Sequence, residues 1–232
     1  MTNRPFFSAS LFALTLIAPP AVLAADASHP IVVELFQSQG CSSCPPAAAN
    51  VRAISDRPEV LALAFEVDYW DRLGWKDTFS SPAWTARQYA YAHAMGRDGI
   101  YTPEVVVNGW AEGDGLDAEG LAALMHEGDR GAGGPDVGFV DGAVTVGAGP
   151  APARGAEVWL ARYDPKVVEV AVKRGENAGR TLPYKNVVRE MILLGRWDGR
   201  PASFPLPAGS DLAEAAIVQT AGSGAILAAA KR

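Results

Sequence analysis

The chain has 232 residues, of which 49% are hydrophobic and 20% are charged, so its composition is that of a folded globular protein and not of a disordered one. Its formal net charge of −6 excludes the basic surface that binds nucleic acid or anionic membranes. Only two cysteines and three histidines are present, which excludes a disulfide-dense scaffold, and we expect no resident metal or other cofactor.

Residues 1–24 predict a secretory signal peptide. Arg4 precedes a mostly apolar run over residues 6–18, and Val22 and Ala24 provide small side chains before a cleavage site. The apolar run is shorter than the ~20 residues that a transmembrane helix needs. We therefore expect cleavage after Ala24, export to a bacterial periplasm or the exterior, and no stable membrane insertion of the mature chain. An uncleaved anchor or a buried helix is the alternative.

Residues 30–130 alternate between strand and helix patterns. The apolar, β-branched run at 31–36 is typical of a buried parallel strand, and Ser81 before Pro82 is a typical helix start. Asn108-Gly109 between two short runs indicates a hairpin turn. In chain order, the patterns predict a strand at 31–36, a helix at 47–55, a strand at 60–67, a helix from Pro82 to a stop at Gly96, strands at 104–107 and 110–112, and a helix at 117–127.

The pattern changes after a glycine-rich break at 128–135. Beyond it, hydrophobic residues tend to alternate with polar ones, which is typical of half-buried strands. We expect an antiparallel sheet or small sandwich over 136–232, with Asp164-Pro165-Lys166 as a hairpin turn. This region contains no cysteine or histidine, so it offers little chemistry of its own. The expected strands are at 143–146, 157–163, 167–172, 187–197 and 216–220.

Cys41-Ser42-Ser43-Cys44 stands between the first strand and the first helix. Two thiols at a helix start can close a small disulfide ring, and the positive end of the helix stabilises a thiolate. A disulfide that closes so short a loop removes little entropy from the unfolded chain. The alternative, an inert structural disulfide, would therefore stabilise the fold only a little. The pattern favours thiol–disulfide exchange: an exposed Cys41 attacks a partner's disulfide, and the shielded Cys44 resolves the mixed disulfide.

The order strand, Cys-x-x-Cys, helix, strand, helix, Thr-Pro, strand, Asn-Gly, strand, helix resembles the thioredoxin fold. More narrowly, the chain is similar to a family of exported bacterial thioredoxin-like proteins of unknown function. The segments that carry this resemblance are 34–36, 40–46, 67–75, 101–103 and 175–182. The resemblance implies a thioredoxin-like α/β fold at 30–130, followed by the β-rich region at 136–232.

The resemblance also implies roles for individual residues. Pro103 corresponds to a cis-proline that places the preceding backbone beside the dithiol, and Thr102 would line a peptide groove there. Glu34, on the strand before the motif, corresponds to a buried acid that takes the proton of the resolving thiol. A buried carboxyl has a raised pKa and can accept a proton near neutrality. The alternative is that Glu34 is exposed at an edge or held in a salt bridge.

The loop after the second strand is unusually aromatic. Tyr69, Trp70 and Trp75 could form a surface on which a partner docks, and we include Trp70 among the candidate substrate-binding residues. The alternative is a local aromatic core, because most large aromatic side chains are packed.

Two functions remain open. The first is a thiol–disulfide oxidoreductase that acts through Cys41 and Cys44 on protein or small-molecule thiols and disulfides. The second is a carrier of copper or another soft metal, because thiolates are suitable ligands for Cu(I). A carrier would need a third ligand, for which His93 and Met95 are candidates by type only. A redox-silent interaction domain is a third possibility.

Overall fold

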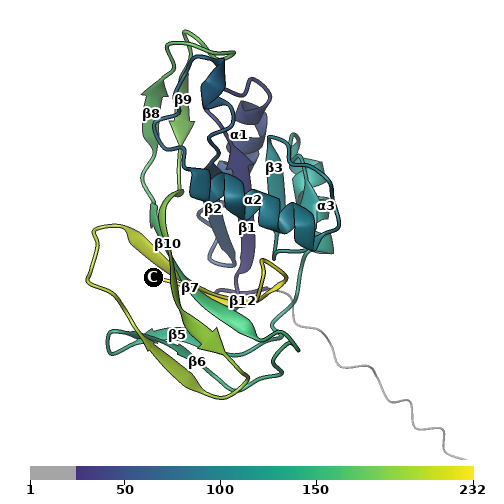
Figure 1. Ribbon diagram of the computed structural model, residues 1–232, viewed down its shortest axis with the longest axis vertical. Coiled ribbons are helices and arrows are strands. Elements are labelled where there is room, and N and C mark those ends of the chain that lie inside the picture. The colour runs from purple at the N-terminus through teal and green to yellow at the C-terminus, as the bar shows by residue number, and fades with distance from the viewer. Residues whose placement is uncertain (1–24) are drawn as a thin grey trace, which may run out of the picture.

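The computed structural model describes residues 25–232, so the predicted signal peptide lies outside the described residues. One large mixed sheet runs through the molecule, with helices on both of its faces in the N-terminal half (Figure 1). A smaller sheet packs at the opposite end (Figure 1). Among the helices of residues 25–232, none is long and apolar enough to cross a membrane.

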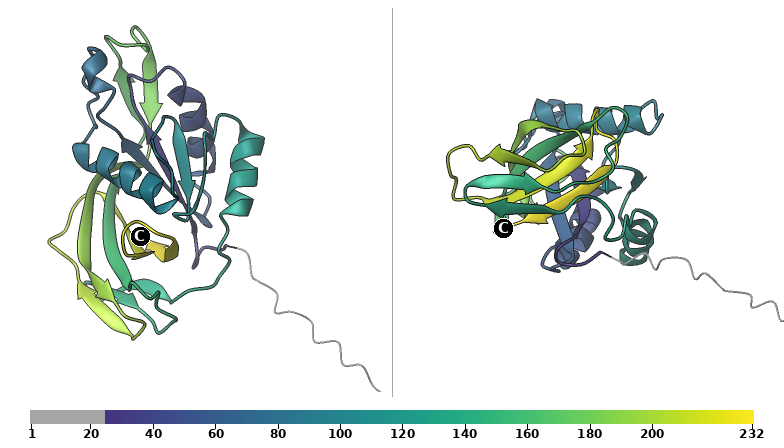
Figure 2. Two further views of the ribbon diagram at one scale, coloured as in Figure 1. Left: turned by 45° about the vertical axis from the view of Figure 1, so that its right-hand side comes forward. Right: turned by 90° about the horizontal axis from the view of Figure 1, so that it is seen from below.

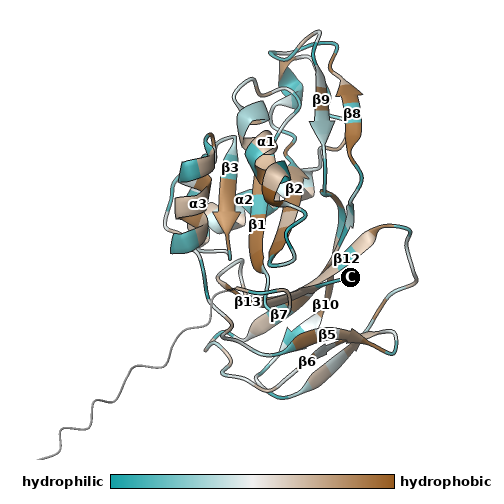
Figure 3. Cartoon of the chain, turned by 180° about the vertical axis from the view of Figure 1, so that it is seen from behind, coloured by the Kyte–Doolittle hydropathy of each residue, from teal (hydrophilic) through white to brown (hydrophobic). Residues whose placement is uncertain are grey.

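The N-terminal half follows the predicted order of elements. Strand β1 pairs in parallel with β2 and antiparallel with β3. Helices α1 and α3 cover one face of these strands and α2 covers the other, so the strands are mostly apolar on both faces (Figure 3). The elements are β1 (Ile31–Gln37), α1 (Cys44–Ile54), β2 (Val60–Glu66), a 3-10 turn (Asp71–Leu73), α2 (Pro82–Ala94), β3 (Glu104–Val107), β4 (Ala111–Gly113) and α3 (Ala118–Glu127).

Local side-chain chemistry sets several of these boundaries. Ser81 caps α2 by accepting a hydrogen bond from the backbone N–H of Ala83, at 3.2 Å. The β3–β4 turn has φ of 45° at Asn108 and 76° at Gly109, as a type I′ turn requires. A side chain at Gly109 would also stand 2.6 Å from the carbonyl oxygen of Gly224. The predicted hairpin is therefore confirmed, and its second residue must be glycine.

The C-terminal half is β-rich, as predicted. Its strands are β5 (Val137–Val140), β6 (Ala143–Val146), β7 (Ala156–Asp164), β8 (Val168–Ala171), β9 (Thr181–Tyr184), β10 (Val187–Trp197), β11 (Ala202–Pro205), β12 (Ala213–Thr220) and β13 (Ile226–Lys231). Strands β11, β6 and β5 form a three-stranded sheet that packs on β7, β10, β12 and β13 around the buried Trp197 (Figure 2).

Both halves contribute to one sheet, whose order is β13-β12-β7-β10-β2-β1-β3-β4. The join is a parallel contact in which Val187 of β10 lies opposite Ala64 of β2. The buried Asn186 beside it donates a hydrogen bond to the carbonyl oxygen of Ala62, at 2.8 Å. The predicted boundary at 128–135 is thus a change of pattern along the chain and not a break in the sheet.

The predicted hairpin at Asp164–Lys166 is wrong. Strand β7 has both edges occupied, by β10 and β12, so no edge remains for β8. Strand β8 instead pairs with β9 in a separate two-stranded arm. The arm rises away from the β-rich end and stands beside α1 (Figures 1 and 2). This displacement brings a C-terminal segment to the cysteine motif.

Candidate functional site

The two cysteines form a disulfide at the start of α1. Cys41 lies in the loop that leaves the buried strand β1, and Cys44 is the first residue of the helix. One face of α1 is buried in the core, as predicted, through Ala47, Val51 and Ile54. This packing fixes the start of the helix beneath the loop. The hydroxyl oxygen of Ser43 lies 3.3 Å from the sulfur of Cys41.

The Thr102–Pro103 loop lies beside this motif, and its peptide bond is cis. The Ser43 hydroxyl donates to the carbonyl oxygen of Thr102 at 3.5 Å. The indole N–H of Trp70 donates to the Thr102 hydroxyl at 2.8 Å. The structure therefore brings Cys41, Thr102, Pro103 and Trp70 together. Trp70 and Tyr69 are only partly exposed and pack against the core, which fits the local aromatic core.

Cys41 is not exposed, contrary to the prediction. Its relative exposure is 0% and that of Cys44 is 2%. Part of the segment between β8 and β9, residues 173–180, lies against the motif, and we call it the cover loop. Asn177 of this loop is buried and donates hydrogen bonds to the carbonyl oxygens of Gln39, at 3.0 Å, and of Cys41, at 2.7 Å.

Glu176 gives the cover loop a second attachment. Its carboxylate accepts hydrogen bonds from the backbone N–H of Ser42, at 3.0 Å, and from the Ser42 hydroxyl, at 2.7 Å. These bonds lower the pKa of Glu176, so the carboxylate is charged at neutral pH. The cover loop is thus held to the dithiol motif by one amide and one carboxylate.

The structure does not bring Glu34 to the disulfide. Successive residues of a strand face opposite sides of the sheet, and Glu34 faces α2, whereas α1 packs on the other side. Its carboxylate is fully buried, 2.8 Å from the guanidinium of Arg87, and accepts a hydrogen bond from the hydroxyl of Tyr91. The salt-bridged alternative therefore describes Glu34.

A different pair of buried acids lies on the α1 side. Glu66, at the end of β2, is fully buried, and its carboxyl oxygen accepts a hydrogen bond from the Gln37 amide at 2.8 Å. Burial, reinforced by the nearby charge of Asp77, raises the pKa of Glu66 well above its ordinary range. Asp77 accepts a hydrogen bond from the N–H of Gln39, at 2.6 Å, and burial raises its pKa also.

Sequence reasoning missed Glu66, although a signal was present. Glu66 shares the parity of Val60, Ala62 and Ala64, and thus the face that α1 covers. An acid that ends an apolar run on that face is a candidate for a buried carboxyl near the motif. No signal in the sequence places Asp77, which reaches this position from a loop.

No metal site accompanies the cysteines in the part of the chain that the structure describes. Within residues 25–232, no group of three or more His, Cys, Asp and Glu side chains is placed to hold a metal ion. His93 is exposed on α2, and Met95 packs against the core. The soft-metal alternative therefore rests on the two cysteines alone.

Comparison with known proteins agrees with this architecture. A crystal structure of a protein from Agrobacterium tumefaciens superposes with a TM-score of 0.71 at 34% sequence identity, covering 89% of this chain and 94% of that one. Among curated proteins, none matches the chain. The profile of a family described as protein of unknown function, DUF1223, matches residues 32–220. This chain therefore belongs to the DUF1223 family.

Proposed function

We propose that this protein is an exported, thioredoxin-like thiol–disulfide oxidoreductase whose active pair is Cys41 and Cys44. The observation that carries the proposal is the position of the disulfide. It closes at the first turn of α1, directly after a buried central strand and against the Thr102–Pro103 loop.

The energetics of this position favour exchange over a structural role. A disulfide that spans three residues removes little entropy from the unfolded chain. A thiolate near the N-terminus of a helix is stabilised by the helix dipole, which makes it a good leaving group. Pro45 and Pro46 lack N–H groups in the first turn. The hydroxyl of Ser43, 3.3 Å from the Cys41 sulfur, offers a donor in their place when its one hydrogen turns from the carbonyl oxygen of Thr102 to the sulfur.

The reaction is a transfer of two electrons by successive thiol attacks. A substrate thiolate forms a bond to one sulfur of the pair, and the Cys41–Cys44 bond breaks, so the other cysteine leaves as a thiolate. A second substrate thiolate then attacks the mixed disulfide and releases the first cysteine. The substrate is oxidised to a disulfide and the protein is reduced to a dithiol, and the reverse sequence reduces a substrate.

Thiol–disulfide exchange between two substrates tests this proposal. The protein is mixed with reduced dithiothreitol and an oxidised test protein, and the thiols that appear on the test protein are followed by alkylation and mass spectrometry. We expect exchange that Cys41→Ala and Cys44→Ala each abolish while folding, followed by circular dichroism, stays intact. Exchange between substrates that survives Cys41→Ala would refute the assignment.

Export is part of the proposal and has its own test. The predicted signal peptide would deliver the chain to an oxidising compartment, where a dithiol–disulfide pair can be reset. N-terminal sequencing of the protein from a bacterial periplasmic extract should find Ala25 as the first residue. An intact Met1 on all of the accumulated protein would contradict it.

A further inference from the structure

A cavity of about 250 Å³ opens beside the disulfide, between the first turns of α1 and strand β9. Its described lining includes Cys44 but not Cys41. The wall opposite α1 comes from the β8–β9 arm, through Leu182 and Tyr184. The cavity therefore borders Cys44, which is itself only 2% exposed, whereas the cover loop lies against Cys41.

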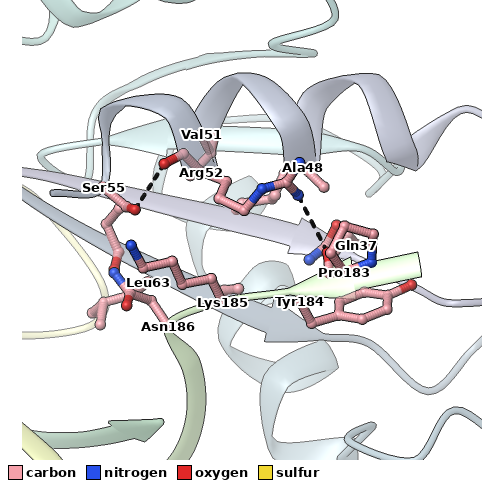
Figure 4. A pocket seen from close by; sticks show the side chains of 13 residues that line it. Gln37, Ala48, Val51, Arg52, Ser55, Leu63, Pro183, Tyr184, Lys185 and Asn186 are labelled. Atoms are coloured by element: carbon pink, nitrogen blue, oxygen red, sulfur yellow. Dashed lines mark hydrogen bonds between the residues drawn. The ribbon is translucent and has the colours of Figure 1, made fainter. Parts of the chain in front are cut away.

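Two arginines give this cavity a positive character. Arg52 is half-buried, and its guanidinium donates to the carbonyl oxygen of Pro183 at 3.3 Å, across the gap from α1 to β9. Figure 4 shows this bond in a neighbouring pocket that shares Arg52 and Pro183 with the cavity. Arg180 lies at the other end of β9 and donates to the side-chain oxygen of Asn177 at 2.7 Å. Both residues line the cavity, and none of its described lining residues is acidic.

The nearest buried acid does not cancel this charge. Glu66 lies behind Gln37, a residue of the cavity wall, and accepts its amide hydrogen bond. Because burial raises the pKa of Glu66, that carboxyl is held in its neutral form more strongly than an exposed acid. Both guanidiniums carry full charge and retain N–H donors beyond the single hydrogen bond of each named above, and guanidinium groups bind carboxylates well.

The size of the cavity limits its ligand. Ligand pockets for drug-sized molecules are about 300–1,000 Å³. A cavity of about 250 Å³ admits a small molecule of a few carbon atoms with its charged group, and excludes a folded polypeptide segment. The apolar walls, which include Pro45 and Leu182, suit a short methylene chain.

We propose that this cavity binds a small thiol that carries a carboxylate, with Arg52 and Arg180 holding the carboxylate and Cys44 as the sulfur that the thiol attacks. The inference rests on the proposed oxidoreductase function and names its substrate class. It also reverses the cysteine roles predicted from the sequence, in which Cys41 makes the first contact.

The chemical step balances without a further reagent. The substrate thiolate forms a bond to the sulfur of Cys44, the Cys41–Cys44 bond breaks, and Cys41 leaves as a thiolate. The Ser43 hydroxyl, 3.3 Å from the Cys41 sulfur, can give up its hydrogen bond to the carbonyl oxygen of Thr102 and donate to that anion. A second substrate thiolate attacks the mixed disulfide, which leaves the substrate oxidised to its disulfide and the protein reduced to its dithiol.

Three thiols of similar size and different charge test the cavity. The oxidised full-length mature protein is reduced with 3-mercaptopropionate, with 2-mercaptoethanol or with cysteamine, which carry a negative, a neutral and a positive group. Second-order rates are compared between Arg52→Gln, Arg180→Gln and the wild type. Because each thiol is compared with itself across proteins, differences in intrinsic thiol reactivity cancel.

We expect each substitution to slow the reaction with 3-mercaptopropionate by about two- to fivefold relative to 2-mercaptoethanol, the range of a partly exposed ion pair. The relative rate with cysteamine should rise. Arg174→Gln is the matched control, because Arg174 is exposed in the same cover loop and is not part of the cavity lining, and it should leave the ratios unchanged. If Arg180→Gln loosens the cover loop, the rates with all three thiols rise together, so the ratios between these rates still measure the effect of the charge.

The attacked sulfur is identified by trapping. The reaction with 3-mercaptopropionate is quenched with iodoacetamide, and fragmentation of the peptide that holds both cysteines places the adduct. We expect the mercaptopropionate adduct on Cys44 and the alkyl group on Cys41. An adduct on Cys41 would overturn the inference. So would a ratio of the 3-mercaptopropionate rate to the 2-mercaptoethanol rate that is the same in Arg52→Gln, Arg180→Gln and the wild type. If none of the three thiols reduces the wild type, the proposed function itself fails.

Discussion

Glu34 and Glu66 are fully buried acids on adjacent strands that face opposite sides of the sheet. Glu34 has a cation, Arg87, at 2.8 Å, whereas Glu66 has the amide of Gln37 and the like charge of Asp77. Burial and the charge of Asp77 raise the pKa of Glu66, which favours its protonated form, although the charge of Arg189 acts in the opposite direction. The two acids therefore have different consequences for stability.

The proton on Glu66 makes stability depend on pH. Burial raises the pKa of Glu66 in the folded protein, so the folded state holds a proton that the unfolded chain loses above its ordinary pKa of about 4.3. As the pH rises from that value, the free energy of unfolding falls by up to ~1.4 kcal/mol per pH unit until the folded group also ionises. Glu66→Gln, which resembles the protonated acid in shape, avoids this loss.

We therefore expect Glu66→Gln to match the wild type near pH 4 and to exceed it at pH 7 by more than ~1 kcal/mol in the free energy of unfolding. Urea titrations of the oxidised proteins at both pH values measure the difference. Glu119→Gln, an exposed substitution on α3, is the control. A difference between Glu66→Gln and the wild type that is the same at both pH values would contradict this account.

Removing the cation of the Glu34–Arg87 pair should destabilise the protein, whereas neutralising Glu66 should stabilise it. Arg87→Met leaves the Glu34 carboxylate buried without its cation and should cost about 3–5 kcal/mol of stability. The double variant with Glu34→Gln should recover most of that loss. If Glu34 is only structural, Glu34→Gln also leaves the rate of thiol exchange per folded molecule unchanged. A large fall in that rate would restore the role that the resemblance implied.

At the residue scale, the Cys41–Cys44 pair is predictable because it is a local motif, whereas the position of Thr102–Pro103 beside it was implied only by the family resemblance. The sequence does not predict the partner of a buried acid. The contacts of Glu34 and of Glu66 depend on α2 and on the loop that holds Asp77, and their positions are set by packing over long sequence distances.

At the element scale, the β8–β9 arm decides what reaches the disulfide. The arm carries the cover loop to the motif and forms one wall of the cavity beside Cys44. The Ser81 cap and the Asn108-Gly109 turn were predictable, because each is a short-range interaction. The arm was not, because the partners of β7 are β10 and β12, which lie far along the chain, and β8 pairs with β9 instead.

The variant Asn177→Ala tests whether the hydrogen bonds of Asn177 keep the cover loop against the cysteine motif. Asn177→Ala leaves the carbonyl oxygens of Gln39 and Cys41 without this donor, which should lower the free energy of unfolding by about 1–3 kcal/mol. In the reduced protein, Cys41 should then react faster with iodoacetamide than in the wild type. Lys173→Ala, an exposed substitution in the same loop, should change neither quantity. Unchanged Cys41 reactivity in Asn177→Ala would show that this loop does not limit access.

At the scale of the whole molecule, the two halves of the chain share one sheet and one core. Ile217 and Ile226 from the C-terminal half are buried with Phe36 and Tyr91 from the N-terminal half. Composition and local pattern correctly predict an α/β half followed by a β-rich half. The joining contact between β10 and β2 follows from no local pattern, because it pairs Val187 with Ala64.

A fragment of residues 25–134 should therefore not fold by itself. Removing the C-terminal half exposes the outer edge of β2 and opens the core around Phe36 and Tyr91. We expect a fragment without a cooperative thermal transition, measured by circular dichroism, while residues 25–232 show one. A cooperative transition in the fragment would indicate that the N-terminal half is an independent domain.

The most direct test of the central claim is an equilibrium redox titration of the mature protein, with the dithiol fraction measured by alkylation and mass spectrometry. If Cys41 and Cys44 are an exchanging pair, one two-electron transition should occur between about −270 and −120 mV, the range of redox-active protein pairs. A midpoint below about −300 mV, where structural disulfides are found, would contradict the account.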